Sequence, residues 1–276
     1  MEGEWEIRQR CVDHILDRLA STPPTLSPFP HFWLDAFLPT DVFERLLDEA
    51  PDQSLFEGSL YGNEHARRPG QIKDGSVNRF AMGMSDAKLG CLPPATEQLW
   101  RGVRNAMGSP RVKQAVFEKL SHGLAHRFRI ADHEAGDIEG YPRIRLMRES
   151  VGYGIKPHTD GRRKLVTLQL AMPCDESQID LGTSLYRIST DPRHMFTSPR
   201  GFQEVMRYPF LPNSVFSFAV VNTMRIRSWH GRPPLEAGCG VRNTLLQVYY
   251  AQRSEGDEDV VREFYGEQAS SAAFHD

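Results

Sequence analysis

The chain has 276 residues, of which 39% are hydrophobic and 25% charged, and its formal net charge is -3. This composition is that of an ordinary soluble globular protein with one large domain or two small ones. The slight negative charge excludes a general attraction to nucleic acid or to an anionic membrane surface, so we expect a small-molecule partner, with no nucleic acid and no membrane involved.

The cysteines and the N-terminus indicate the compartment. Cys11, Cys91, Cys174 and Cys239 lie far apart without a C-x-x-C pair, which predicts neither a disulfide framework nor a zinc ribbon. The chain opens with alternating charges instead of the apolar run of a signal peptide, and no segment approaches about 18 apolar residues. We therefore expect a cytoplasmic protein.

The first half of the chain, residues 1–140, is predicted to be rich in helices. Apolar residues at helical spacing over 12–19, followed by the helix-stopping residues 21–24, predict an opening amphipathic helix of about five turns. Further helices are expected at 40–50, 95–107 and 110–128, with strands at 30–34 and 77–84. Between them, residues 52–76 are rich in glycine and hold Arg67 and Arg68. A stretch of this length predicts either a mobile lid or a purely structural loop.

After Gly140 the pattern changes to short strands separated by turns. Strands are predicted at 141–147, 165–172, 182–188, 202–208, 214–221, 224–229 and 241–250. Seven or eight strands without intervening helices favour an antiparallel double sheet over residues 141–252, mainly β with helices packed against it. With a short tail at 253–276, the whole chain is expected to form a single catalytic domain.

The motif His158-Thr159-Asp160 follows a predicted strand. In an extended chain residues i and i+2 point to the same side, so the imidazole and the carboxylate can converge on one ion. Two imidazoles and one carboxylate suit Fe(II) and leave coordination positions open. A lone His-x-Asp is usually an ordinary surface sequence, so the motif needs a third ligand, and His230 is the candidate.

Three other histidines are not expected to bind metal: His31 is interpreted as structural, and His122 and His126 as solvent-facing or core-edge residues. His31 lies in an aromatic strand without a carboxylate beside it. His122 and His126 are one helical turn apart, but the glutamate of a zinc-protease motif is absent between them. By contrast, Arg242 and Thr244 share one face of the last strand and offer a charged fork and a hydroxyl to a carboxylate.

In order and approximate spacing, this set resembles the His-x-Asp…His…Arg pattern of Fe(II)- and 2-oxoglutarate-dependent oxygenases, in particular the bacterial branch similar to prolyl 4-hydroxylase domains. The resemblance covers about residues 30–251 and is specific from 141 onward. It implies a double-stranded β-helix, a cupin-like jelly roll, buttressed by the N-terminal helices. It also implies roles for named residues: Fe(II) ligands His158, Asp160 and His230; an anchor, Arg242, for the distal carboxylate of 2-oxoglutarate, assisted by Thr244; and weaker cosubstrate-pocket candidates Tyr153 and Gln169, for which core packing is the alternative.

The reaction implied by the resemblance consumes 2-oxoglutarate and O2, releases succinate and CO2, and hydroxylates a substrate. Basic residues could clamp a carboxylate or phosphate on that substrate, exposed charge being the alternative interpretation: Arg162, Arg163 and Lys164 after the motif, and Arg67 and Arg68. We expect a small anionic or amino-acid-like metabolite. A peptidyl or protein hydroxylase and a cupin-like, non-oxidative metal-binding protein are the alternatives, and a buried Arg242 favours the oxygenase because an unpaired buried guanidinium would be costly.

Overall fold

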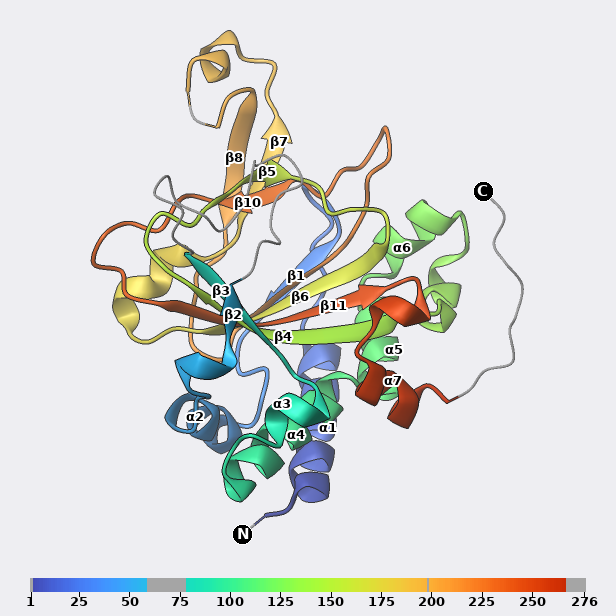
Figure 1. The fold of residues 1–276 in the computed structure, drawn as a ribbon. Helices are drawn as coiled ribbons and strands as arrows, with labels where there is room; N and C mark the ends of the chain where they lie inside the picture. Colours follow the sequence, from blue (N-terminus) through green and yellow to red (C-terminus); the bar gives the residue numbers. More distant parts are fainter. Residues whose placement is uncertain (1, 59–77, 198, 267–276) are drawn as a thin grey trace.

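Two β-sheets face each other in the computed structural model, which describes residues 2–58, 78–197 and 199–266 (Figure 1). A seven-stranded sheet has the order β1-β9-β6-β11-β4-β3-β2, and a four-stranded sheet has the order β5-β10-β7-β8. Their bounds are β1 His31–Leu34, β2 Glu57–Gly58, β3 Arg79–Gly83, β4 Tyr141–Glu149, β5 Ile155–His158, β6 Lys164–Met172, β7 Ser184–Ile188, β8 Phe202–Arg207, β9 Val215–Ala219, β10 His230–Arg232 and β11 Arg242–Tyr250.

The strand pairing is nested. β4 pairs with β11, β5 with β10, β6 with β9, and β7 with β8. Every one of these pairs is antiparallel. This is the pairing of a jelly roll, in which a long antiparallel ribbon is wound into two facing sheets. The predicted double-stranded β-helix is therefore confirmed.

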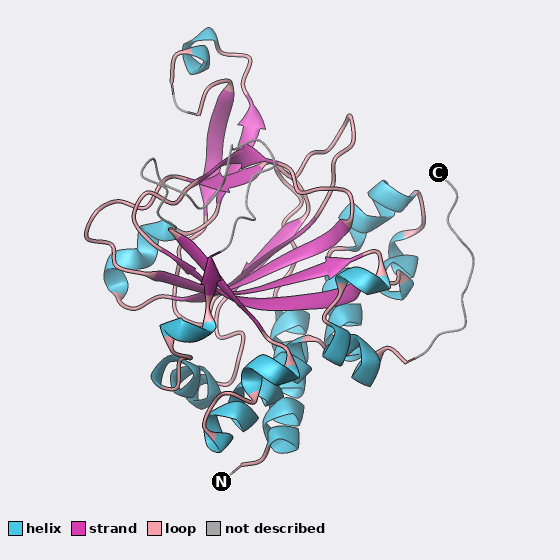
Figure 2. Cartoon of the chain, viewed as in Figure 1, coloured by secondary structure: helices cyan, strands magenta, loops and turns pink. Residues whose placement is uncertain are grey.

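Helices gather on the outer face of the longer sheet (Figure 2). Leu146, Leu168 and Leu245 on that face belong to one buried cluster with Ile15 and Trp100 from the helices. The opposite, inner face of the sheet therefore looks toward the shorter sheet. The helices are α1 Glu4–Ser21, α2 Thr40–Asp48, α3 Asp86–Leu89, α4 Pro94–Met107, α5 Pro110–Lys119, α6 Ser121–Phe128 and α7 Glu258–Phe264.

The predicted helix over 110–128 is in fact two helices. The backbone changes direction at Leu120, with φ -99° and ψ 15°, where α5 ends and α6 begins. Gly123 of α6 then packs so closely that an added Cβ would lie 2.7 Å from the Cβ of Ala219 on β9. The turn between the helices thus brings α6 onto the sheet.

The predicted strand over 224–229 was wrong. Thr223 Oγ1 accepts a hydrogen bond from the Ile226 backbone N–H at 3.1 Å, and Met224 is 98% exposed, so this segment is a tight surface loop. A threonine side chain that bonds its neighbouring backbone competes with a strand ladder. The strand begins later, at His230. Tyr153, a weaker cosubstrate-pocket candidate, lies in the turn between β4 and β5.

The suggested lid, residues 52–76, falls largely outside the described residues, as do Arg67 and Arg68. Its described beginning holds a short 3-10 turn, Gln53–Leu55, and the edge strand β2. Within the described ranges, the helices are all too short or too polar to cross a membrane.

Candidate metal centre

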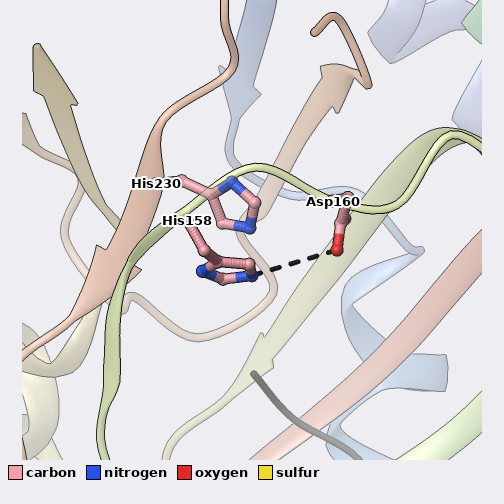
Figure 3. A group of neighbouring side chains, drawn as sticks. All are labelled: His158, Asp160 and His230. Carbon is pink, nitrogen blue, oxygen red and sulfur yellow. Dashed lines mark ion pairs between the residues drawn. The ribbon is translucent and has the colours of Figure 1, made fainter. Parts of the chain in front are cut away.

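Three side chains converge between the two sheets: His158 at the end of β5, Asp160 two residues later, and His230 at the start of β10 (Figure 3). His158 and His230 are directly opposite in the β5–β10 register. One ligand atom of each of the three residues lies within 4.8 Å of the other two. His158 Nε2 is 3.9 Å from Asp160 Oδ1. These three side chains can hold a metal ion.

Backbone carbonyls fix the tautomer of both imidazoles. His158 Nδ1 is 3.0 Å from the Lys156 carbonyl oxygen, and His230 Nδ1 is 2.9 Å from that of Ser228. A carbonyl oxygen can only accept, so Nδ1 carries the proton in each neutral ring. The lone pair is then on Nε2, and this outer hydrogen bond is the usual way in which a metal-binding histidine is oriented.

Burial keeps both rings neutral. It lowers the pKa of His158, and burial together with the neighbouring His158 lowers the pKa of His230 to about 3. For Asp160, burial opposes ionisation, but the charge of Lys164 and its hydrogen bond to the carboxylate hold the pKa well below its usual range. At neutral pH the site therefore presents two neutral imidazoles and one carboxylate, the forms that bind a cation.

Both oxygens of the Asp160 carboxylate are held by side chains from β6. Thr167 Oγ1 donates to Oδ2 at 2.8 Å, and Lys164 Nζ donates to Oδ1 at 2.5 Å. The sequence singled out Lys164 only as a candidate substrate clamp, and it gave no signal for Thr167. Oδ1, the oxygen nearer His158 Nε2, is thus the one shared with an ammonium group.

Gly231, directly after the third histidine, permits the close approach of β10 to β5. A Cβ at this position would lie 2.5 Å from the Ile155 carbonyl oxygen, closer than atoms can approach. Only glycine fits there without moving one strand. The His230-Gly231 pair therefore sets the distance between the two histidine-bearing strands.

Arg242 lies at the opposite end of the inner face and is almost fully buried, as is Thr244. Its Nη1 donates to Thr244 Oγ1 at 2.6 Å and to Glu149 Oε2 at 2.9 Å, and its Nε donates to the Leu181 carbonyl oxygen at 2.8 Å. The guanidinium also stacks on Phe210, 4.0 Å from the ring centroid. The structure thus brings Arg242 and Thr244 together, and adds an internal carboxylate that sequence reasoning missed.

Glu149 is shared by three arginines. Arg232 Nη2 lies 2.7 Å from Oε2, beside Arg242, and Arg79 Nε lies 3.4 Å from Oε1. Burial opposes ionisation of Glu149, but Arg232, Arg242 and Arg79 lower its pKa to about 2. Three buried guanidinium groups around one carboxylate leave an excess of positive charge, which favours a further anion.

The two weaker pocket candidates lie on either side of this cluster. The Tyr153 ring contacts the guanidinium groups of Arg79 and Arg232, at 5.1 and 5.4 Å from the ring centroid. Gln169 lines a small pocket together with Trp33, Thr183, Phe216 and Arg242, and its Oε1 accepts a hydrogen bond from Thr183 Oγ1 at 3.1 Å. Gln169 therefore lines the same pocket as Arg242, whereas Tyr153 contacts Arg79 and Arg232.

His31 is clearly not a ligand. Its Nδ1 is 2.6 Å from the Phe29 carbonyl oxygen and its Nε2 is 2.7 Å from the Tyr208 hydroxyl, so both ring nitrogens are engaged. His126 Nε2 contacts Thr223 Oγ1 at 3.1 Å, on the helical side of the molecule. Arg162, a substrate candidate, is exposed in the turn after Asp160.

No family model matches the sequence, and neither does any curated protein. Solved structures do resemble the chain. A prolyl-4-hydroxylase from Pseudomonas putida is 15% identical over 87% of this chain and 99% of that chain, with a TM-score of 0.42. An oxidoreductase of the 2OG-Fe(II) oxygenase family from Burkholderia pseudomallei is 11% identical over 89% and 93%, with a TM-score of 0.45. Dioxygenase for auxin oxidation 1 from Arabidopsis thaliana, solved with 2-oxoglutarate, is 12% identical over 92% and 91%, with a TM-score of 0.47. These similarities are too distant to assign a family, so the function rests on the site residues.

Proposed function

We propose that the chain is an Fe(II)- and 2-oxoglutarate-dependent dioxygenase that hydroxylates a small metabolite. The observation that carries this proposal is the group His158, Asp160 and His230, whose ligand atoms lie within 4.8 Å of one another, with Nδ1 of each imidazole bonded to a backbone carbonyl so that Nε2 is free to bind a metal. A carboxylate in the triad offsets part of the charge of Fe(II) and fills a third protein position. A metal held by only these three side chains would leave room for the cosubstrate and O2 to bind it.

Arg242 supports the proposed dependence on 2-oxoglutarate. A 2-oxoglutarate molecule bound at the triad would have a second carboxylate to be held elsewhere in the barrel. That carboxylate needs a cationic partner inside the barrel, and Arg242 is buried there with Thr244 at its side. The pocket that Gln169, Thr183 and Arg242 line offers polar groups beside aromatic walls, as small-molecule sites do.

When bound, Fe(II) would couple the oxidative decarboxylation of 2-oxoglutarate to hydrogen abstraction from the substrate. The chain's own residues supply position and electrostatics. Thr167 holds one oxygen of Asp160 so that the other faces the metal. The aromatic residues Phe216 and Phe218 on the inner face of β9 form an apolar wall next to His230, which keeps water from the reacting centre.

A small substrate is the proposed partner because the described chain is a single barrel with its helices, and the site lies between its sheets. A peptidyl or protein hydroxylase would use the same chemistry on a larger partner. The four cysteines are free thiols, which fits the reducing cytoplasm as its location.

The test is formation of succinate from 2-oxoglutarate under air with added Fe(II), measured with and without candidate metabolites. The wild-type protein should form succinate slowly alone and faster with its substrate. The Asp160→Ala variant should lose this activity. The control variant His122→Ala, which changes an exposed histidine, should keep it. A wild-type protein that binds Fe(II) but forms no succinate with any metabolite would favour the non-oxidative, cupin-like alternative.

A further inference from the structure

Lys164 reaches the metal centre because β6 carries a β-bulge at its start. Lys164 and Val166 are opposite consecutive residues of β11, so Leu165 is an extra residue between them. In a regular strand, residues 164 and 167 would point to opposite faces. The bulge reverses the face of Lys164, as bulges beside functional sites do. Lys164 and Thr167 therefore both contact the carboxylate of Asp160.

The backbone of Lys164 is held firmly, whereas its side chain can turn. The Lys164 backbone N–H donates to the Gly161 carbonyl oxygen at 3.0 Å, and Arg127 Nη1 donates to the Lys164 carbonyl oxygen at 2.6 Å. The Lys164 side chain is 31% exposed, against 7% for Asp160. Because lysine has a flexible four-carbon stem, a change of rotamer can carry the ammonium from the carboxylate to solvent without unpacking the sheet.

The ammonium lies among the three proposed ligands. Lys164 Nζ donates to Asp160 Oδ1 at 2.5 Å, and the same oxygen is 3.9 Å from His158 Nε2. Burial is the main cause of the low pKa of His158 and of His230, and the charge of Lys164 lowers both further. Burial also lowers the pKa of Lys164, but the charge of Asp160 and its hydrogen bond outweigh burial and raise it. Lys164 is thus a cation placed at the metal centre.

A divalent ion and this ammonium compete for one oxygen. Thr167 Oγ1 donates to Asp160 Oδ2 at 2.8 Å, so Oδ1 is the oxygen left for a metal. An ion bound to Oδ1 would face the ammonium of Lys164 across a single atom, and like charges at that range repel strongly in a buried site. A buried carboxylate needs a cationic partner, and either cation meets that need.

We propose that Lys164 is an internal counter-ion that holds Asp160 until a divalent cation binds, and that the metal then displaces its ammonium toward solvent. Metal binding is therefore an exchange of one cation for another at Asp160. Lys164 acts as a positioning residue, which keeps the carboxylate oriented for the metal and takes no part in ligation. The inference rests on the metal-binding part of the proposed function and is independent of the oxygenase reaction.

The first experiment compares the melting temperatures of wild type and Lys164→Met, with and without saturating Mn(II). Methionine keeps most of the stem and removes the charge. Without Mn(II), Lys164→Met should melt at least about 4 °C below wild type, because Asp160 loses its buried partner. With Mn(II), the two proteins should melt within about 1 °C of each other, because the displaced ammonium no longer contributes.

Thr167→Val is the matched control. Its hydrogen bond to Oδ2 persists when the metal binds Oδ1, so this variant should melt below wild type in both conditions. If Lys164→Met differed from wild type equally with and without Mn(II), the ammonium would not be exchanged and the inference would be overturned. Absence of Mn(II) binding in both wild type and Lys164→Met would also overturn it.

A second measurement needs only the wild-type protein. Limited acetylation with acetic anhydride, followed by mass spectrometry of the peptides, reports how accessible each ammonium is. Lys164 should be acetylated several-fold faster at saturating Mn(II) than without it, whereas Lys156, exposed on the neighbouring β5, should react at the same rate in both conditions. Equally slow acetylation of Lys164 in both conditions would contradict the inference. Failure of the succinate assay with the exchange intact would remove the oxygenase function and leave the exchange standing.

Discussion

Arg242 Nη1 lies 2.9 Å from Glu149 Oε2, and the two residues are directly opposite in the β11–β4 register. The guanidinium expected to anchor a cosubstrate is thus already fixed by a carboxylate of the protein. Because Arg232 and Arg79 share that carboxylate, pairing with Glu149 does not exhaust the positive charge. Glu149 therefore holds the Arg242 guanidinium in place.

The first prediction concerns stability and pH in Glu149→Gln. The folded-state pKa of Glu149 is lowered from 4.5 to about 2, so its charge stabilises the fold above the unfolded pKa and the effect is lost as pH falls toward 2. We expect the variant to be about 3 kcal/mol less stable at pH 7, and the difference to shrink to about 1 to 2 kcal/mol at pH 3. Urea unfolding at pH 7, 5 and 3 measures this. A difference that does not change with pH would mean that Glu149 acts through packing and not through its charge.

The second prediction separates ligands from structural histidines. His158→Ala, Asp160→Ala and His230→Ala should each abolish turnover and weaken Fe(II) binding strongly, with an unchanged circular dichroism spectrum because the core is built without the metal. His31→Ala is the buried control: it removes two hydrogen bonds and should lower the melting temperature, yet it should bind Fe(II) like wild type. His126→Ala should keep both the melting temperature and the Fe(II) binding of the wild-type protein. Normal turnover in Asp160→Ala would show that the carboxylate has been misassigned.

The third prediction uses the two side chains that hold Asp160. Thr167→Val removes the hydrogen bond to Oδ2 without changing the shape of the side chain, so Mn(II) and Fe(II) should bind about tenfold more weakly. Lys164→Met removes an ammonium that shares Oδ1 with the metal, and metal binding should become tighter since repulsion between two cations is lost. Metal titrations followed by Mn(II) electron paramagnetic resonance check both. If the two variants changed affinity in the same direction, the division of roles between the two oxygens would be wrong.

The fourth prediction concerns the anchor. Arg242→Ala should raise the apparent constant for 2-oxoglutarate by roughly one to three orders of magnitude, since loss of one partner of a buried charge pair costs about 2 to 5 kcal/mol. Arg242→Lys should recover only part of this, because lysine keeps the charge but not the fork. Fe(II) titrations should be unchanged in both variants. An unaltered 2-oxoglutarate titration would instead point to Arg232 as the anchor.

The double sheet and the His158–Asp160 pair of the candidate metal centre could be predicted from the sequence because their signals are local, whereas His230 is remote in the sequence and was only a candidate third ligand. Alternation along strands gave the double sheet, and His158, Asp160 and His230 have side-chain types and spacing that few other sites need. The charge cluster around Glu149 could not be found this way, since Arg79, Arg232 and Glu149 come from three separate segments that only the fold brings together. One signal was available: the alternation in β4 continues past Met147, and its next inward position is Glu149.

The strand over 224–229 was wrong for a related reason. Its apolar residues fit an alternating pattern, but the hydrogen bonds of Thr223 to the Ile226 backbone favour a loop. Local side-chain bonds of this kind are not visible in hydrophobic periodicity. The predicted strand thus ended one residue before β10 begins, at His230.

The most direct test of the account is the visible spectrum of the protein with Fe(II) under anaerobic conditions, before and after addition of 2-oxoglutarate. If His158, Asp160 and His230 hold Fe(II) with positions open for a chelating keto acid, 2-oxoglutarate should produce a metal-to-ligand charge-transfer band in the wild-type protein. The band should be absent in Asp160→Ala and should require much more 2-oxoglutarate in Arg242→Ala. Tight Fe(II) binding without any band at saturating 2-oxoglutarate would contradict the account.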